Sequence, residues 1–209
     1  MSETGDDPRA ARRSRRNTRA RLVEAAADVF ATKPLGRVTV DDLVGAAGFS
    51  RGAFYSNYST IEDLFFDVYA DQADLMLAAV SSAVDQVPPD SFDLDSIGVV
   101  FAALTPFGRR WFPLHNEFTL LAVRDADARA RFGAHVERFQ HRIEELVTRV
   151  LHLLGRRPVV SDEHVSDVLL ALYLHSLGAE LLGSGGLPPD RLVTAVLPHL
   201  ILGLSTPAD

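Results

Sequence analysis

The chain has 209 residues, 47% of them hydrophobic and 23% charged, which is typical of folded globular proteins and excludes a disordered chain. It contains no cysteine, which excludes disulfides, a thiolate nucleophile and a cysteine-ligated zinc site. The net charge is −7, which argues against a nucleic-acid partner only if the charge is spread evenly.

The longest uncharged stretch, 192–208, is interrupted by prolines and polar residues and is too short to span a bilayer. The amino terminus has no apolar run of the kind found in secretory signals. We therefore expect a cytoplasmic protein without a membrane partner.

The charge is divided unequally between the two ends of the chain. Residues 1–60 hold ten basic and seven acidic residues, whereas residues 61–209 hold eleven basic and twenty-one acidic residues. Seven arginines and no acid lie within Pro8–Val23. We predict a flexible arginine-rich arm at 1–16, with Arg16 and Arg19 as candidate DNA contacts, because such clusters bind phosphates by releasing counterions. A solubilising tail has the same composition.

Two helices are predicted after the arm. Apolar residues at helical spacing indicate a first helix from about Asn17 to Ala31. Thr39, with Asp42 three residues later, forms a carboxylate variant of the capping box that starts a short second helix.

A tight turn and a third short helix follow. Gly48 supplies the backbone freedom for the turn, and Ser50 is suited to cap a helix over 51–57. Two short helices joined by a glycine-centred turn, with a longer helix on either side, indicate a helix-turn-helix DNA-binding domain at 17–60.

The rest of the chain is also predicted to be helical, which makes the fold class all-α. Helices are expected from Thr60 to about Val87, at 93–105, at 113–124 after Pro113, at 127–154, at 162–182 and at 190–204. The last two are apolar on more than one face, which favours a dimer interface, although the central helices of a monomeric bundle have the same pattern.

The candidate interface residues are Val168, Leu172, His175, Ala179, Leu192, Val196 and Leu200. The residue that follows Leu192 is Val193. Val193 belongs to the apolar set of the helix at 190–204 but is not assigned to the interface.

The stretch TVDDLVGAAGFSRGAFYSNY at 39–58, followed by EDL at 62–64, resembles the amino-terminal signature of TetR-family transcriptional regulators. The resemblance covers roughly residues 17–65. It implies a homodimer that binds double-stranded operator DNA, with residues 61–209 forming a helical-bundle effector-binding and dimerisation domain. It also implies a repressor that a small-molecule effector releases from a near-palindromic operator. Some relatives activate instead, and a ligand-independent DNA-binding or architectural protein is the alternative.

The third helix must present small or polar residues to base edges while its other face packs in the core. Arg51 can donate hydrogen bonds to guanine or to a phosphate, and Gly52 and Ala53 allow a close approach to the groove floor. Phe54 is expected to face the core.

Further contacts are expected at the DNA backbone. The resemblance implies that Tyr55 and Asn57 contact it, and contacts of this kind set register rather than sequence preference. Ser50 and Thr39 are either caps alone or phosphate donors as well. A core role is favoured for Tyr58. Ile61 stands where the family commonly has a lysine, so one phosphate contact is expected to be missing, and the arginine-rich arm is expected to replace it.

The middle and end of the chain hold a mixture of aromatic and polar residues typical of effector pockets, although ordinary cores have the same composition. The candidate pocket residues are Phe101, Phe107, Trp111, His115, Phe118, Thr119, Phe139, Tyr173 and Ser176. No catalytic or metal-binding motif is present, so we expect neither an enzyme nor a cofactor nor a metal site.

Overall fold

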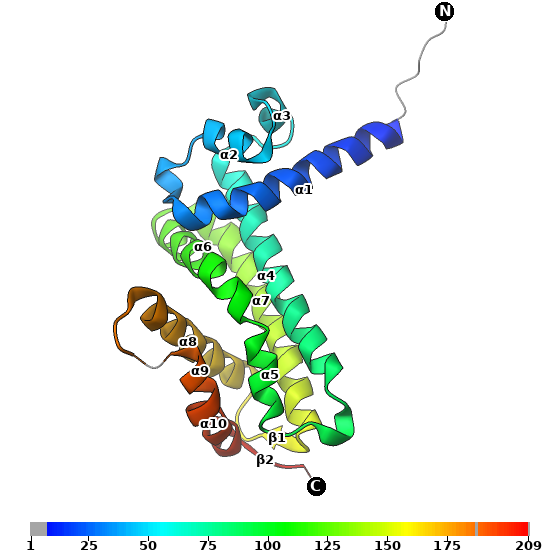
Figure 1. Ribbon diagram of the computed structural model, residues 1–209, viewed down its shortest axis with the longest axis vertical. Helices are drawn as coiled ribbons and strands as arrows, with labels where there is room; N and C mark the ends of the chain where they lie inside the picture. Colours follow the sequence, from blue (N-terminus) through cyan, green and yellow to red (C-terminus); the bar gives the residue numbers. More distant parts are fainter. Residues whose placement is uncertain (1–7, 187, 209) are drawn as a thin grey trace, which may run out of the picture. The chain divides into compact units, whose positions relative to one another are not determined.

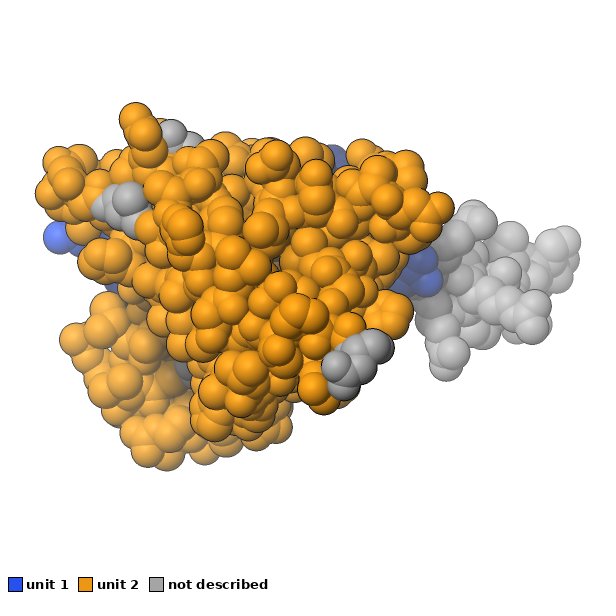
Figure 2. All heavy atoms as spheres, turned by 90° about the horizontal axis from the view of Figure 1, so that it is seen from below, with its two compact units in different colours: residues 1–72 blue, residues 73–209 orange. Residues whose placement is uncertain are grey.

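The computed structural model describes residues 8–186 and 188–208, with side chains for all of these except 8–14, 132 and 190. In this part of the chain nearly every element is a helix, which confirms the all-α class (Figure 1). The chain divides into two compact units, one up to Gln72 and the other from Ala73 onward (Figure 2).

The first unit consists of α1 (Pro8–Thr32), η1 (Leu35–Arg37), α2 (Val40–Ala47), α3 (Arg51–Tyr55) and the first part of α4 (Ile61–Gln86). Side chains from each of the four α-helices are fully buried in it, namely Leu22, Leu43, Phe54 and Leu64. The rings of Phe30 and Phe65 meet edge to face, with centroids 5.1 Å apart. This core fixes the orientation of the two short helices between α1 and α4.

Helix α1 begins at Pro8 rather than near Asn17, so residues 8–16 of the predicted flexible arm are helical. A proline suits the first position of a helix because its missing N–H would have no partner there, and alanine and arginine favour helix. Residues 1–7 of the predicted arm lie outside the described residues. Arg16 and Arg19 lie on exposed positions of α1.

The second unit contains the rest of α4, η2 (Pro89–Ser91), α5 (Ser96–Ala102), α6 (Thr105–Arg124), α7 (Ala126–Leu153), β1 (Arg156–Pro158), α8 (Asp162–Leu182), α9 (Pro189–Arg191), η3 (Leu192–Val196), α10 (Leu197–Leu204) and β2 (Ser205–Pro207). Helix α7 packs against both α6 and α8. The two three-residue strands pair antiparallel, with Arg157 opposite Thr206. This pairing joins the segment after α10 to the segment after α7.

Pro113 and Pro198 both lie inside helical segments. Helix α6 begins at Thr105 and continues through Pro113, where the sequence predicted a helix start. Pro113 removes one helical hydrogen bond, and the remaining bonds and buried residues keep the helix continuous. Pro198 is preceded by the π-helical turn η3. A proline has no N–H to donate to the carbonyl four residues earlier, and its ring clashes with that carbonyl. The wider π-helical turn makes room for the ring.

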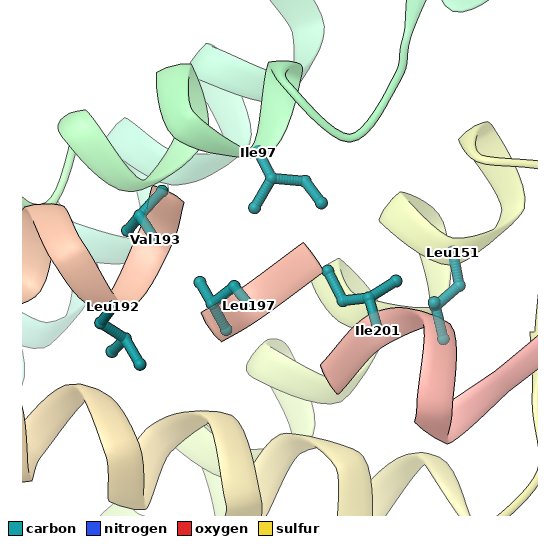
Figure 3. Packing of buried hydrophobic residues seen from close by; sticks show 6 residues of the cluster. All are labelled: Ile97, Leu151, Leu192, Val193, Leu197 and Ile201. Atoms are coloured by element: carbon teal, nitrogen blue, oxygen red, sulfur yellow. The ribbon is translucent and has the colours of Figure 1, made fainter. Parts of the chain in front are cut away.

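The carboxyl-terminal helices are covered largely by their own chain. Leu192 and Leu197 are fully buried, and they pack with Ile201, Ile97 of α5 and Leu151 of α7 (Figure 3). Leu192 therefore lies in this unit's core and not on a surface open to a partner, because its side chain is fully covered by its own chain.

The neighbouring position 193 is also part of this core. The residue there, Val193, has a side chain that is 9% exposed. A Cβ atom built at Gly98 of α5 would lie 3.9 Å from Val193 Cγ1, so the valine faces α5. Leu192 and Val193 are thus both buried within their own chain.

The other predicted interface residues differ in exposure. Val168 and His175 are exposed, and Leu172, Val196 and Leu200 are partly buried, whereas Ala179 is buried. Among the described residues, α8 is the one helix long and apolar enough in composition to cross a membrane. Core helices of soluble proteins meet the same criterion.

Burial of His115 predicts a pH-dependent stability. His115 stacks on Trp111 with ring centroids 4.7 Å apart, and burial lowers its pKa from 6.5 to about 4. Between these two pH values the unfolded chain binds a proton that the folded chain does not, so the free energy of unfolding falls as pH is lowered through this window. We expect H115Q to remove up to about 3 kcal/mol of this dependence.

Urea unfolding at pH 7 and at pH 4.5 measures the effect. The variant H199Q, which changes an exposed histidine, is the matched control. If H115Q and wild type lose equal stability between the two pH values, His115 does not titrate as its burial requires.

Candidate nucleic-acid interface and ligand cavity

Helix α3 has one buried and one exposed face. Phe54 is fully buried, as predicted, whereas Ser50, Arg51 and Gly52 are exposed and Tyr55 is 61% exposed. The Ser50 hydroxyl caps the helix by accepting a hydrogen bond from the Ala53 amide at 3.2 Å. The exposed residues therefore form a short, rigidly held surface.

The turn before α3 depends on Gly48, whose φ of 68° lies in the left-handed region that side chains other than glycine rarely adopt. The capping box predicted at the start of α2 is present. The Asp42 amide donates to the Thr39 hydroxyl at 3.2 Å, and the Thr39 amide donates to the Asp42 carboxylate at 2.9 Å. Lys33, together with the Thr39 donors, lowers the pKa of Asp42 to about 2.

Arg51 is held by Asp41 of α2. Its Nε donates to Asp41 Oδ1 at 2.6 Å, and its Nη2 donates to Asp41 Oδ2. The hydrogen bonds from Arg51 lower the pKa of Asp41, and the pKa of Arg51 is raised in return. Both side chains are largely exposed. This pair uses one edge of the guanidinium and leaves the Nη1 donors and one Nη2 donor directed elsewhere.

Tyr58 anchors the end of the helix-turn-helix segment. It is buried, as predicted, and its hydroxyl donates to Asp67 Oδ2 at 2.7 Å. Arg19 Nε donates to the same oxygen at 2.7 Å, and its guanidinium lies 4.9 Å from the centroid of the Tyr58 ring. Burial, followed by the bond to Asp67, raises the pKa of Tyr58. Arg19 thus has an internal partner in addition to its predicted role at DNA.

Two other predicted contacts also have partners inside the domain. Asn57 is half-buried, and its Nδ2 donates to the Ala53 carbonyl at 2.8 Å. The Thr39 hydroxyl donates to Asp42 at 2.8 Å. Ile61, the first residue of α4, is partly buried and offers no charge to a phosphate.

Gly52 is not required by the packing of the domain itself. A Cβ atom built at this position would meet only the Ser50 hydroxyl at 3.7 Å, which is ordinary van der Waals contact. Its backbone is helical, and glycine weakens a helix by about 1 kcal/mol relative to alanine. The folded chain therefore does not by itself require a glycine at position 52.

The second unit contains a cavity of about 140 Å³, partly open to solvent, between α4, α5, α7, α8 and α10. Three of the predicted pocket residues, Phe101, Phe139 and Tyr173, line it. The other lining side chains are mostly aliphatic, as at Met76 of α4 and Leu146 of α7.

The remaining predicted pocket residues, Phe107, Trp111, His115, Phe118, Thr119 and Ser176, do not line this cavity. Trp111 and Phe118 are fully buried, and Trp111 stacks on Phe139 with centroids 5.5 Å apart. The sequence pattern missed the aliphatic lining because leucine and valine in a cavity wall are indistinguishable from core residues. No group of three histidine, aspartate or glutamate side chains gathers to hold a metal among the residues that were described.

Comparison with solved structures establishes the fold over most of the chain. A transcriptional regulator from Rhodococcus sp. Rha1 is 22% identical, with a TM-score of 0.66 over 89% of this chain and 95% of that one. A TetR-family transcriptional regulator from Thermus thermophilus is 16% identical, with a TM-score of 0.57 over 87% and 97%. A proposed regulator from Saccharomonospora viridis, solved with choline, is 13% identical, with a TM-score of 0.69 over 91% and 98%.

A search of curated proteins found no match. The short capped helices and the glycine turn define a helix-turn-helix domain of the kind that binds DNA. Residues 22–68 match the model of the bacterial regulatory proteins of the tetR family, so the chain carries the amino-terminal domain of TetR-family transcriptional regulators, as its sequence predicted.

Proposed function

We propose that the protein is a homodimeric repressor that binds a near-palindromic operator and is released from it by a small molecule. The observation that carries this proposal is the exposed surface of α3, where Arg51, Gly52 and Tyr55 stand on a helix anchored by Phe54. A helix exposed on this side and held rigidly on the other is suited to enter a major groove. A protein seated on a promoter excludes polymerase without other machinery.

The distribution of charge also supports DNA binding by the first unit. Arg15, Arg16 and Arg19 are exposed along α1, and the acidic excess of the chain lies after residue 60. Each arginine that neutralises a phosphate adds to a salt-dependent binding energy that does not depend on base sequence. These arginines compensate for the missing charge at Ile61.

Dimerisation would use the apolar side chains that α8 and α10 leave uncovered. Val168 and Leu202 are about two-fifths exposed, and Leu182 is 80% exposed. Apolar surface of this kind on consecutive carboxyl-terminal helices is stabilised when a second copy covers it. The twofold axis of such a dimer would match an operator whose half-sites are about 34–36 Å apart.

Helix α4 is the element through which a ligand would act. Its residues up to Gln72 belong to the first unit, and Met76, Leu77 and Val80 line the cavity of the second. A ligand that favours one position of this helix shifts the population of DNA-binding conformations only by its difference in affinity for the two states.

Selection of bound sequences from a random duplex pool, with the purified full chain at moderate salt, tests the proposal. We expect a near-palindromic consensus and two chains per duplex in sedimentation. A monomer, or a lack of preference for any sequence at low salt, would rule the proposal out. A specific operator that no candidate compound releases would instead favour the alternative of ligand-independent DNA binding.

A further inference from the structure

We infer that the cavity binds an uncharged, largely apolar molecule about the size of one substituted aromatic ring, which places a single hydrogen-bonding group against Tyr173. The inference rests on the proposed function for its biological role, but its physical basis is the cavity alone. It concerns the chemical class of ligand that the second unit accepts.

The residues that line the cavity favour an uncharged ligand. Of the 21 residues around the cavity, only Tyr173 and Ser205 have polar side chains, and none has a charged one. Moving a carboxylate or an ammonium group into such a site without a partner costs several kcal/mol. Three aromatic walls, from Phe101, Phe139 and Tyr173, are suited to contact a flat ring.

The two polar lining groups are not equivalent. The Ser205 hydroxyl accepts a 2.7 Å hydrogen bond from Arg156 Nε and donates to the Ile201 carbonyl, so its one donor is already used. Arg156 is itself engaged, because its Nη2 donates to the Ser205 carbonyl at 2.7 Å. The Arg156 guanidinium beside Ser205 is thus held by the chain.

Tyr173 is the remaining polar lining residue, and its hydroxyl lies next to α6, because a Cβ atom built at Gly108 would be 3.3 Å from its oxygen. It is buried, and its hydroxyl makes no hydrogen bond to other residues in the described part of the chain. Burial raises the pKa of Tyr173 to about 12, so the hydroxyl stays protonated near neutral pH and can both donate and accept. A ligand that extends a hydroxyl or carbonyl to this oxygen satisfies it.

The volume limits the size of the ligand. An engineered cavity of about 150 Å³ lined by leucine, isoleucine and phenylalanine in another protein stays dry and binds benzene. The cavity described above has about the same volume and a similar lining. A single ring with one or two small substituents fits within this volume, whereas a fused polycyclic molecule exceeds it and would extend out of the cavity.

Four probes of matched size test the inference on the full chain without DNA. Calorimetry is performed with toluene, p-cresol, p-toluate and choline at pH 7, where p-cresol is uncharged. We expect toluene and p-cresol to bind, with p-cresol about 5-fold tighter because it satisfies Tyr173, and p-toluate and choline to bind at least 10-fold more weakly than toluene.

Two variants locate the site. Y173F should abolish the 5-fold advantage of p-cresol and leave toluene unchanged. I143W, which fills the cavity from α7, should weaken both neutral probes at least 10-fold, and its near-ultraviolet circular dichroism establishes whether the fold is intact. If I143W does not fold, the Y173F comparison still decides.

Tighter binding of p-toluate or choline than of toluene would overturn the inference, and so would an absence of binding by either neutral probe. Addition of p-cresol to the operator complex is measured separately. If p-cresol binds the free chain and leaves the operator complex intact, the release mechanism fails while the inference about ligand class holds.

Discussion

Replacing Arg51 by alanine should lower affinity for the selected operator by about 10- to 100-fold, which corresponds to about 1–3 kcal/mol, and should remove the preference for guanine at one position in each half-site. The Arg51–Asp41 pair occupies Nε and one Nη2 donor. The donors that remain on Nη1 and Nη2 form the fork that matches N7 and O6 of guanine. Fluorescence anisotropy on the operator and on single-base variants of it measures both effects.

The control for charge is R191A, which removes an exposed arginine from the second unit. If R51A lowers affinity for the operator and for random duplex by the same factor, and no more than R191A does, Arg51 acts through phosphates alone.

The variant D41N separates two roles of Asp41. If Asp41 positions Arg51, its loss should reduce the guanine preference several-fold without lowering affinity for random DNA. Equal gains on all sequences would show instead that Asp41 competes with DNA for Arg51.

Replacing Gly52 by alanine should change stability and DNA binding in opposite directions. The free energy of unfolding should rise by up to about 1 kcal/mol, because alanine favours helix and the new Cβ meets only ordinary contacts. Operator affinity should fall by about 10-fold or more, because the added methyl group keeps α3 from approaching the groove floor. Chemical unfolding and anisotropy titration on the same preparation measure the two quantities.

Gly45 provides the matched control. It is an exposed glycine in α2, and a Cβ atom there would meet nothing within 4 Å. G45A should therefore raise stability through the same helix propensity and leave operator affinity within about twofold. A G52A variant that binds the operator as tightly as wild type would contradict the close approach of α3 to DNA.

Local chemistry explains why the first unit was largely predictable. Thr39, Gly48 and Ser50 act on their own backbone or on groups within a few residues, so their residue types predicted the caps and the turn. Phe54 was placed in the core because the resemblance puts an apolar core residue at that position, and it is fully buried. The early start of α1 was missed because a run of arginines indicates solvation as readily as helix.

Interactions between distant residues were not predictable in the same way. Tyr58 and Asp67 meet Arg19 from another helix, and Asp41 holds Arg51 across the turn. A charged residue in the sequence has several possible partners, and the packing of α1, α2 and α4 selects one. The sequence therefore indicated candidate site residues without indicating what holds them.

The sequence by itself determined the all-helical class, the capped helices of the DNA-binding domain and the family of its amino-terminal segment, because these depend on local periodicity and short motifs. Only the tertiary structure decided which apolar residues line the cavity and which, such as Leu192 and Val193, fill the core. The physical reason is that burial depends on which helices meet, and leucines facing a void and leucines facing a neighbour have the same pattern in the chain.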